Sequence, residues 1–575
     1  MSNLLTGIAA SPGFAIAKAY RLKASTYVPV RSEVTDTKQE AQRFREAVEQ
    51  AKQELESIRE LTEARLGSQK AEIFESHLLS LEDPDFIDVI LDNIVQEAIN
   101  AEYALHEVSQ AFIEALLAMD NELLRERAAD VRDVSGRLMS GLRGEKYTTV
   151  SDIAEESIII AEDLSPSDTA QLNLDVVRGF ITEIGSRTSH SAIMARSLGI
   201  PAIVGVGASA GEITAGVTVI MDAVEGRMVV DPSEEELEAY RQKKEQYEIR
   251  QAELSKLKDQ PTISKDGRQV ELAANIGSVE DMQKVLDNGA EGIGLFRTEF
   301  LYMGRSSFPT EEEQFKVYKY VLEKMEGKPV VIRTLDIGGD KELPYLELPK
   351  ESNPFLGLRA VRLCLDRQDL FRTQLRALLR ASRHGQLKIM FPMIAVLEEL
   401  LEAKRLLQEE RDKLVQEGQA VADHIEVGMM IEVPAAALAA DSFAQEVDFF
   451  SIGTNDLIQY TMAADRMNET VSYLYQPCHP SILRLIQMVI RAAEREGKWV
   501  GMCGEMAGDE TAIPLLLGLG LHEFSMSASS ILPARALIRE LVQEEWVAHA
   551  DRALAMRSQN EIKEYVHMLT RSDSK

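Results

Sequence analysis

Cysteine, positive charge and long hydrophobic runs are all scarce in this sequence of 575 residues. The three cysteines, Cys364, Cys478 and Cys503, are odd in number and far apart, which argues against a disulfide framework and a cysteine-rich metal site. Lys and Arg number 63 against 94 Asp and Glu, so the net charge of −31 disfavours nucleic acid and anionic lipid as partners. No apolar run reaches the roughly 18 to 20 residues that span a bilayer. We therefore expect neither nucleic-acid binding nor membrane insertion.

The start of the chain, MSNLLTGIAASPG, lacks the basic and apolar regions of a secretion signal, which predicts a cytoplasmic location. The composition, 45% hydrophobic and 27% charged, is typical of globular proteins. The chain is too long for a single hydrophobic core, so we expect about three or four domains.

Glycine and proline are scarce in one stretch, from about residue 35 to 142. Its apolar residues recur three and four positions apart, as at Leu105, Val108 and Phe112, which predicts helices. Pro84 indicates a break between two of them. Strand-like runs lie on both sides of the stretch, at 7–10, 14–20, 157–161, 179–184, 202–206 and 217–221. The pattern therefore predicts a helical bundle inserted into an α/β domain.

A charged helix is predicted from Ser233 to about Lys258, because Ser233 and Glu236 form a capping-box pattern. At about 1.5 Å per residue it would span roughly 35 to 40 Å. A lever between domains and a solvated surface helix both remain open for it.

From Lys265 onward, eight strand-like runs alternate with helical patterns, which predicts a parallel (β/α)8 TIM barrel. The runs are 271–276, 292–297, 330–337, 387–394, 427–433, 449–454, 500–503 and 523–527. In such barrels the active site lies at the C-terminal ends of the strands.

Those strand ends carry residues suited to a small anion and a divalent metal. Four arginines provide paired donors for phosphate and carboxylate oxygens: Arg297, Arg333, Arg359 and Arg466. Glu432 and Asp456 are hard oxygen ligands of the kind that Mg²⁺ accepts. A single arginine is more often part of a structural salt bridge, but four together with two acids favour phosphoryl transfer or enolate chemistry.

Cys503 is the last residue of the predicted barrel strand 500–503 and lies between Gly501 and Gly504. A lone cysteine is usually a small buried residue. At this position it is also a candidate for donating or accepting a proton on carbon.

His190 lies in the run 185–191, between a strand-like stretch at 179–184 and a helical one at 192–198. The first turn of a helix directs backbone N–H groups and the positive end of its dipole at an anion. Neighbouring hydroxyls and Arg187 add donors, so the imidazole is a candidate nucleophile toward phosphorus. A histidine that merely caps a helix is the alternative.

Two segments resemble the signatures of the phosphoenolpyruvate-utilising enzymes. They are GSRTSHSAIMAR at 185–196 and DFFSIGTNDLIQYTMAADR at 448–466, and the segments at 126–133 and 338–344 are also similar to that family. The order of segments resembles that of the Enzyme I family of the bacterial sugar phosphotransferase system. Ser186 departs from the pattern, since the family usually has glycine or alanine there.

This resemblance implies a phosphoenolpyruvate-protein phosphotransferase that needs Mg²⁺ and catalyses the first step of sugar uptake. His190 would take the phosphoryl group, with release of pyruvate, and pass it to a histidine of the carrier protein HPr. Asn455 would contact the phosphate, Cys503 would protonate the methylene carbon, and the barrel would form a homodimer. Supporting roles beside His190 would fall to Arg187 and to Thr169 or Thr188, either of which is a candidate for orienting the imidazole.

The resemblance also implies a domain layout. Residues 1–33 and 144–232 would form the phosphohistidine α/β domain, and 34–143 the inserted HPr-binding bundle, where His77 lies in a segment similar to the docking face. Residues 233–262 would form the linker helix, and 263–575 the barrel that binds phosphoenolpyruvate.

Three other functions compete with this interpretation. ATP-using members of the same family carry a nucleotide-binding domain, and this chain has no glycine-rich phosphate loop between a strand and a helix. A metal-dependent barrel lyase fused to an interaction module would not need His190. A purely regulatory binding protein would not turn over phosphoenolpyruvate.

Overall fold

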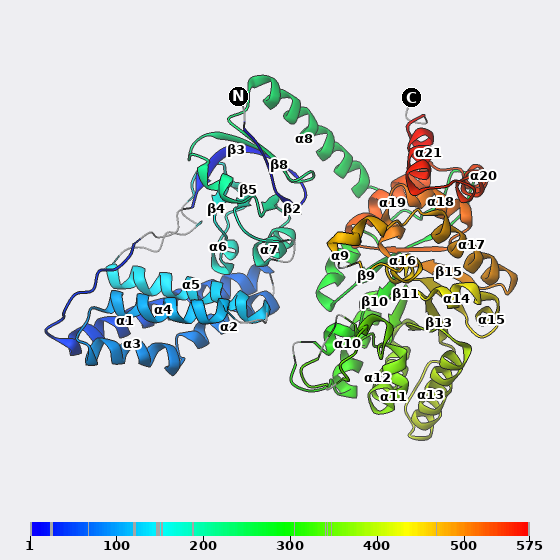
Figure 1. Cartoon of the computed structure of the whole chain (residues 1–575), viewed down its shortest axis with the longest axis horizontal. Helices are drawn as coiled ribbons and strands as arrows, with labels where there is room; N and C mark the ends of the chain where they lie inside the picture. The colour runs from blue at the N-terminus through cyan, green and yellow to red at the C-terminus, as the bar shows by residue number, and fades with distance from the viewer. Residues whose placement is uncertain are drawn as a thin grey trace. The chain divides into compact units, whose positions relative to one another are not determined.

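A computed structural model describes residues 3–22, 27–66, 68–118, 122–144, 150, 153–186, 189–303, 305–339, 341, 343–346, 348–466 and 468–572. The chain divides into two compact units, Met1–Arg250 and Gln251–Lys575 (Figure 1). The first unit contains a helical bundle and a β-sheet, and the second contains a closed barrel. Within the described ranges, no helix is long and apolar enough to cross a membrane.

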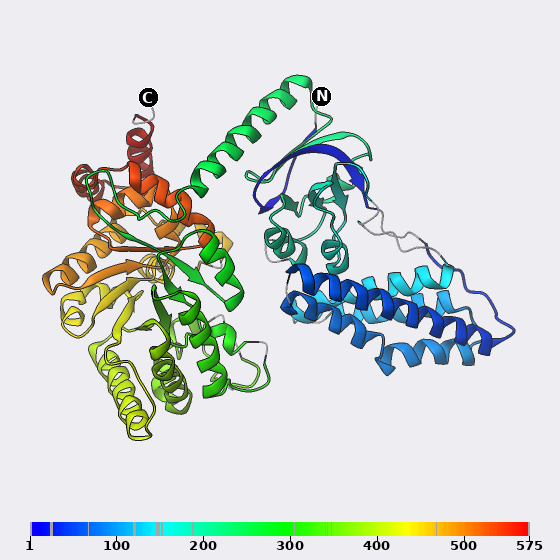
Figure 2. The same cartoon turned by 180° about the vertical axis from the view of Figure 1, so that it is seen from behind.

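The described part of the predicted helical stretch forms a bundle of long helices (Figure 2). The predicted break is confirmed, because α3 begins at Pro84, where a missing N–H is tolerated, and Asp83 caps it by accepting from the backbone N of Asp85 at 2.9 Å. Phe44 and Ile90 are among the fully buried side chains of its core. The helices are α1 (Thr37–Leu66), α2 (Ser68–Ser80), α3 (Pro84–Gln96), α4 (Ala101–Leu117) and α5 (Glu122–Arg143).

His77, in α2, is fully buried inside the bundle. Its Nε2 atom lies 3.1 Å from Oδ1 of Asp130, and its Nδ1 atom lies 3.7 Å from Oδ2 of Asp133. The imidazole therefore cannot touch a docked protein, and its place in the expected docking segment reflects packing between α2 and α5.

The bundle is inserted between two neighbouring strands of the sheet. Strand β3 ends at Arg21 and β4 begins at Ser157, and the two pair in parallel. The sheet has the order β1-β8-β7-β3-β4-β5-β6-β2. Its strands are β1 (Asn3–Thr6), β2 (Ile8–Ser11), β3 (Phe14–Arg21), β4 (Ser157–Ala161), β5 (Val177–Thr182), β6 (Ala202–Val204), β7 (Thr218–Asp222) and β8 (Arg227–Val230).

All six strand-like runs predicted for this sheet form strands. Strands β1 and β8, which pair antiparallel with each other at one side of the sheet, were not predicted from the sequence. Each has only four residues, and Leu4 in β1 is exposed, so neither shows the apolar alternation on which strand prediction depends.

The predicted charged helix is α8 (Glu234–Ser255). Its 22 residues correspond to about 33 Å, slightly less than expected. The capping box is confirmed, because Ser233 Oγ accepts from the backbone N of Glu236 at 3.3 Å and the Glu236 carboxylate accepts from the backbone N of Ser233 at 2.8 Å. The division between the two units falls within this helix.

The predicted (β/α)8 barrel is confirmed. Its eight strands are parallel and close in sequence order, with the last strand paired to the first. They are β9 (Glu271–Ile276), β10 (Gly292–Phe296), β11 (Pro329–Arg333), β12 (Gln386–Phe391), β13 (Glu426–Ile431), β14 (Phe449–Ile452), β15 (Trp499–Met502) and β16 (Glu523–Met526). Predicted run 330–337 was too long, because Leu335 and Ile337 are buried in the loop that follows β11.

Helices of this unit surround the strands (Figure 1). They are α9 (Met282–Asp287), α10 (Glu311–Lys324), α11 (Val361–Asp366), α12 (Gln368–Ala381), α13 (Leu397–Gln416), α14 (Pro434–Leu438), α15 (Ala440–Ala444), α16 (Thr454–Met462), α17 (Pro480–Arg495), α18 (Ala512–Leu519), α19 (Ala528–Glu540), α20 (Gln543–Leu554) and α21 (Gln559–Ser572).

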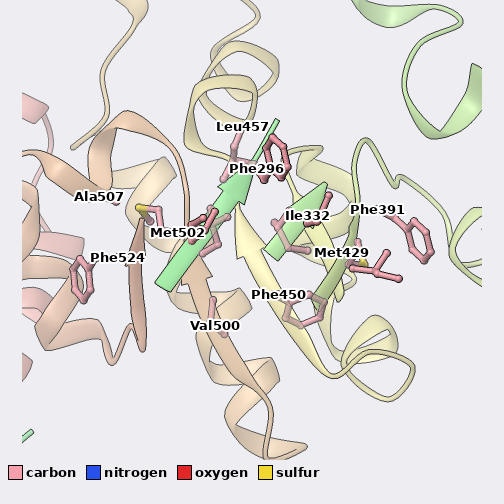
Figure 3. Close-up of a cluster of buried hydrophobic side chains, with 14 of the residues drawn as sticks. Phe296, Ile332, Phe391, Met429, Phe450, Leu457, Val500, Met502, Ala507 and Phe524 are labelled. Atoms are coloured by element: carbon pink, nitrogen blue, oxygen red, sulfur yellow. The ribbon is translucent and has the colours of Figure 1, made fainter. Parts of the chain in front are cut away.

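Two hydrophobic layers hold the barrel together, because side chains alternate between the two faces of each strand. Ile332, Met429 and Phe450 belong to the large cluster that includes residues of the surrounding helices (Figure 3). Their neighbours Val331, Met430 and Phe449 belong to a separate small cluster, which is the interior of the barrel. This alternation decides which residues at the strand ends face the interior.

Candidate active site

A cavity of about 490 Å³ lies at the C-terminal ends of the barrel strands. The strand alternation explains its composition: Val331 is interior, so Arg333 is too, and Met430 likewise precedes Glu432 on the interior face. Cys503 directly follows β15 and belongs to the interior cluster. The cavity brings together all eight barrel residues that the sequence predicted, namely Arg297, Arg333, Arg359, Glu432, Asn455, Asp456, Arg466 and Cys503.

Two of the arginines are held by a buried carboxylate at the base of the cavity. Arg333 Nη1 lies 3.0 Å from Oδ2 of Asp336, and Arg359 Nη2 lies 2.9 Å from Oδ1 of the same side chain. Although burial opposes it, the charges of the two arginines hold the pKa of Asp336 well below its usual range. Arg333 also pairs with the buried Glu299. Both guanidinium groups are therefore preorganised and remain charged.

Glu432 and Asp456 are two acidic side chains that line the same cavity, where they could bind a cation. Burial, followed by the charge of Asp456, raises the pKa of the Glu432 carboxyl to about 8. One oxygen of Glu432 accepts from the backbone N of Met393 at 2.6 Å. Oδ1 of Asp456 is buried and has no hydrogen-bond partner among the described residues. The Asp456 carboxylate pairs with Arg359 at 3.6 Å and with Arg466 at 3.7 Å, distances too long for hydrogen bonds, so its Oδ1 atom can still accept a hard divalent cation.

No group of three or more His, Cys, Asp and Glu side chains that could hold a metal lies in the part of the chain that the structure describes. The pair of acids at the cavity is therefore a sparse site, with only two protein carboxylates. Mg²⁺ commonly keeps several waters and substrate oxygens in its octahedron, so two carboxylates are sufficient for it.

Asn455 and Arg466 lie at the two ends of the segment that contains α16. Asn455 is in the first turn of the helix, and its Oδ1 atom accepts from the Tyr475 hydroxyl at 3.0 Å. The backbone N of Arg466 donates to Gln459 Oε1 at 3.0 Å, and its Nη1 atom lies 3.7 Å from Oδ1 of Asp456. These contacts place an amide and a guanidinium group on the cavity wall.

Cys503 is almost fully buried between the barrel interior and the cavity. Burial raises the pKa of its thiol to about 11, so the side chain is protonated at neutral pH. A protonated thiol at the wall of the cavity can donate a proton but is a poor nucleophile.

Alkylation tests this description of the cysteines. All three are buried, and burial raises the pKa of each thiol, to about 12 for Cys478. We expect iodoacetamide at pH 8 to modify the native protein at least about 100-fold more slowly than the urea-unfolded chain, measured by mass spectrometry at each site. Modification of native Cys503 at the unfolded rate would contradict both its burial and its protonated state.

His190 is the first residue of α7 (His190–Leu198) in the other unit. The predicted turn is present, with Ser189 as N-cap: its Oγ accepts from the backbone N of Ala192 at 3.4 Å and donates to the Ser186 carbonyl at 2.9 Å. Since Ser189 provides the cap, His190 is not needed for that purpose. The side chain of His190, and Arg187 and Thr188, lie outside the described residues.

Thr169 lies in α6 (Pro166–Ala170), which packs against α7. Its side chain is fully buried, and its hydroxyl donates to the Ser165 carbonyl at 3.2 Å. Nearby, the Ser191 hydroxyl donates to Asp163 Oδ1 at 3.4 Å. The hydroxyls around the turn thus tie α7 to the loops before α6.

Four further polar side chains line the cavity without a role predicted from the sequence: Asp336, Lys341, Tyr475 and Glu505. Asp336 lies near the end of the predicted run 330–337 and Glu505 just after the run 500–503, so their sequence positions already place them at strand ends. Lys341 and Tyr475 lie in loops, and only the fold brings them to the cavity. Tyr460, in α16, is not among the residues that line the cavity, but its hydroxyl contacts Arg359 Nη1 at 3.1 Å and donates to the Phe355 carbonyl at 2.6 Å.

Comparison with known proteins agrees with this combination of a histidine turn and a barrel cavity. The N-terminal domain of phosphoenolpyruvate-utilising enzymes matches residues 6–127, their mobile domain matches 153–226, and their phosphoenolpyruvate-binding domain matches 251–543. These three matches define the class as the phosphoenolpyruvate-utilising enzymes.

Full-length relatives define the family more closely. The chain is 61% identical to the phosphoenolpyruvate-protein phosphotransferase of Priestia megaterium over 98% of this chain and 99% of that protein. It is 60% identical to that of Bacillus subtilis (98% and 99%) and 57% identical to that of Listeria monocytogenes (99% and 100%). The chain belongs to the phosphoenolpyruvate-protein phosphotransferase family, known as Enzyme I.

Proposed function

We propose that this chain transfers the phosphoryl group of phosphoenolpyruvate to its own His190 and then to a histidine of HPr. The observation that carries the proposal is the cavity, which combines four arginines, two acids and a buried thiol. Phosphoenolpyruvate is a small trianion with one carboxylate and one phosphate, the two groups that arginine binds through paired, charge-assisted hydrogen bonds. Similarity to phosphoenolpyruvate-protein phosphotransferases over nearly the whole chain supports the same assignment.

The arginines would hold the substrate through charge-assisted hydrogen bonds. Arg333 and Arg359 are fixed by Asp336, so they bind an anion without losing much side-chain entropy. Arg297 and Arg466 lie on the same cavity and add charge, and Asn455 contributes an uncharged donor to the phosphate. Glu432 and Asp456 would hold Mg²⁺, which when bound supplies positive charge to the phosphate and to the developing enolate.

In the first reaction, the imidazole nitrogen of His190 attacks phosphorus in line with the bond to the enol oxygen. An N–P bond forms, the P–O bond breaks, and its electron pair remains on the enolate of pyruvate. The Cys503 thiol then donates its proton to the methylene carbon, which completes pyruvate, and the thiolate recovers a proton from solvent. Arg187 and Thr169 or Thr188 would support His190 in this reaction.

We assign the second reaction, transfer to HPr, to the first unit. In this assignment the helical bundle, residues 34–143, docks the carrier, and the α/β domain, residues 1–33 and 144–232, presents His190. The linker helix, residues 233–262, joins these two domains to the barrel, residues 263–575. His190 must reach the barrel cavity in one reaction and HPr in the other, so the units have to move relative to each other. Dimerisation through the barrel, a cytoplasmic location and the link to sugar uptake follow from the family resemblance.

Labelling with phosphoenolpyruvate tests the proposal. We expect radiolabelled phosphoenolpyruvate with Mg²⁺ to give a protein-bound label that is acid-labile and base-stable, as phosphohistidine is, and that moves to added HPr. Labelled ATP should give none. Label from ATP alone would instead indicate an ATP-using relative, and pyruvate formation without any label would indicate a lyase.

A further inference from the structure

Asn455 has an amide whose orientation is determined by two neighbours. Its Oδ1 atom lies 3.3 Å from the backbone N of Glu505 and 3.0 Å from the Tyr475 hydroxyl. A backbone N–H can only donate, so the atom facing it must be the amide oxygen. The Tyr475 hydroxyl therefore also donates to this oxygen.

The other end of the amide has no such partner. No described residue accepts a hydrogen bond from Nδ2 of Asn455, although the residue lies on the cavity wall. With the oxygen held by two donors, the NH2 group is left for whatever occupies the cavity. An NH2 group suits a phosphate, whereas the carbonyl end of a flipped amide would repel one.

Tyr475 is well suited to hold this orientation. It follows the short helix 469–474 and is partly buried, and it lines the same cavity. Burial, together with the charge of Glu505, raises the pKa of Tyr475 to about 12, so the phenol keeps the proton that it donates. The alternative is that Tyr475 only packs on the barrel, in which case its hydroxyl would not matter.

We propose that Tyr475 is a positioning residue that directs the Asn455 amide NH2 group toward the phosphate of the bound substrate. The inference rests on the proposed function and deepens it, because it separates the part of the cavity that recognises phosphate from the part that recognises carboxylate. Tyr475 acts through Asn455 and does not itself take part in the chemistry.

Two small ligands separate the positioning role from simple packing. Phosphoglycolate carries a carboxylate and a phosphate, as the substrate does, whereas oxalate carries two carboxylates and no phosphate. We expect Tyr475→Phe to weaken phosphoglycolate binding by about 3- to 10-fold, the effect of losing one neutral hydrogen bond, and to leave oxalate binding unchanged. Calorimetric titration of the full chain with excess Mg²⁺ measures both.

A double-mutant cycle completes the test. In an Asn455→Ala background Tyr475→Phe should have no further effect on phosphoglycolate, because the group through which it acts is gone. Tyr473→Phe is the matched control: it makes the same change two residues away, at a side chain that is 69% exposed, and should leave both affinities unchanged. Thermal unfolding shows that each variant is folded.

The possible results are distinguishable. Equal weakening of both ligands by Tyr475→Phe, no weakening of either, or an effect that persists with Asn455→Ala would overturn the positioning role and leave the proposed function standing. Failure of the wild-type chain to bind phosphoglycolate would overturn the proposed function and this inference together.

Discussion

Replacement of His190 by alanine is expected to abolish the transfer of phosphate from phosphoenolpyruvate to HPr. In the proposed relay the phosphoryl group passes from phosphoenolpyruvate to HPr through the imidazole of His190, so its removal leaves no route between the two. A fall on the order of 10⁴-fold or more is expected, as for removal of other covalent nucleophiles. The measurement is formation of labelled HPr in the presence of Mg²⁺ and radiolabelled phosphoenolpyruvate.

The control for this change is His567→Ala, which removes an exposed histidine of α21 and should leave transfer intact. Binding of phosphoglycolate to the His190→Ala protein should be unchanged, since all the residues that line the cavity belong to the barrel unit. Undiminished turnover of phosphoenolpyruvate by His190→Ala would refute the relay and favour the barrel lyase.

The second large effect is expected for Glu432→Gln, which should weaken binding of Mn²⁺, used as a paramagnetic stand-in for Mg²⁺, by at least about 100-fold. Loss of an outer-shell partner typically costs about 10- to 100-fold in metal affinity, and loss of a direct ligand should cost no less. Titration followed by electron paramagnetic resonance measures binding without any turnover. Unchanged Mn²⁺ affinity would show that Glu432 is not a ligand.

The matched control is Glu426→Gln. Glu426 is the first residue of β13, whereas Glu432 directly follows the last residue of that strand. The Glu426 carboxylate pairs with Lys388 Nζ at 3.0 Å and accepts from Trp499 Nε1 at 3.1 Å, away from the cavity residues. Mn²⁺ affinity should therefore be unaffected. If Glu426→Gln lowered Mn²⁺ affinity as much as Glu432→Gln, the loss would reflect disturbance of the barrel structure and not removal of a metal ligand.

The pH dependence of Mn²⁺ binding provides an independent check on Glu432. Its pKa is raised to about 8, so below that pH the carboxyl holds a proton that the metal must displace. The affinity of the wild-type protein should therefore rise as the pH increases toward about 8 and level off above it. In Glu432→Gln this part of the pH dependence should be absent.

Much of the architecture follows from local patterns. The alternation of eight strand-like runs with helical ones predicted the barrel, and apolar residues three and four positions apart, in a stretch with little glycine or proline, predicted the bundle; both are confirmed. Strands β1 and β8 escaped prediction because strands of four residues with exposed side chains lack a clear period. Hydrophobic periodicity follows burial, and both β1, at the edge of the sheet, and its neighbour β8 are only partly buried.

The residues of the candidate site likewise include some that the sequence could identify and some that it could not. Arg333, Glu432 and Cys503 could be assigned from sequence because they lie at the ends of barrel strands, and the ends of parallel strands must meet at one mouth. Tyr475 and Lys341 could not, since no local pattern says where a loop residue lies in space. The burial of His77, which the family resemblance placed in a docking segment, could not be predicted from the sequence either.

By itself, the sequence determined most of the elements, their order and the chemical types present at each barrel strand end, because these depend on neighbours along the chain. Only the tertiary structure decided which donors face which acceptors: that Asp336 joins Arg333 to Arg359, that Asp456 keeps a carboxylate oxygen without a hydrogen bond, and that the Tyr475 hydroxyl donates to the amide oxygen of Asn455. These pairings join residues from separate strands, loops and helices. Their distances depend on how the whole barrel closes and packs, so no local pattern encodes them.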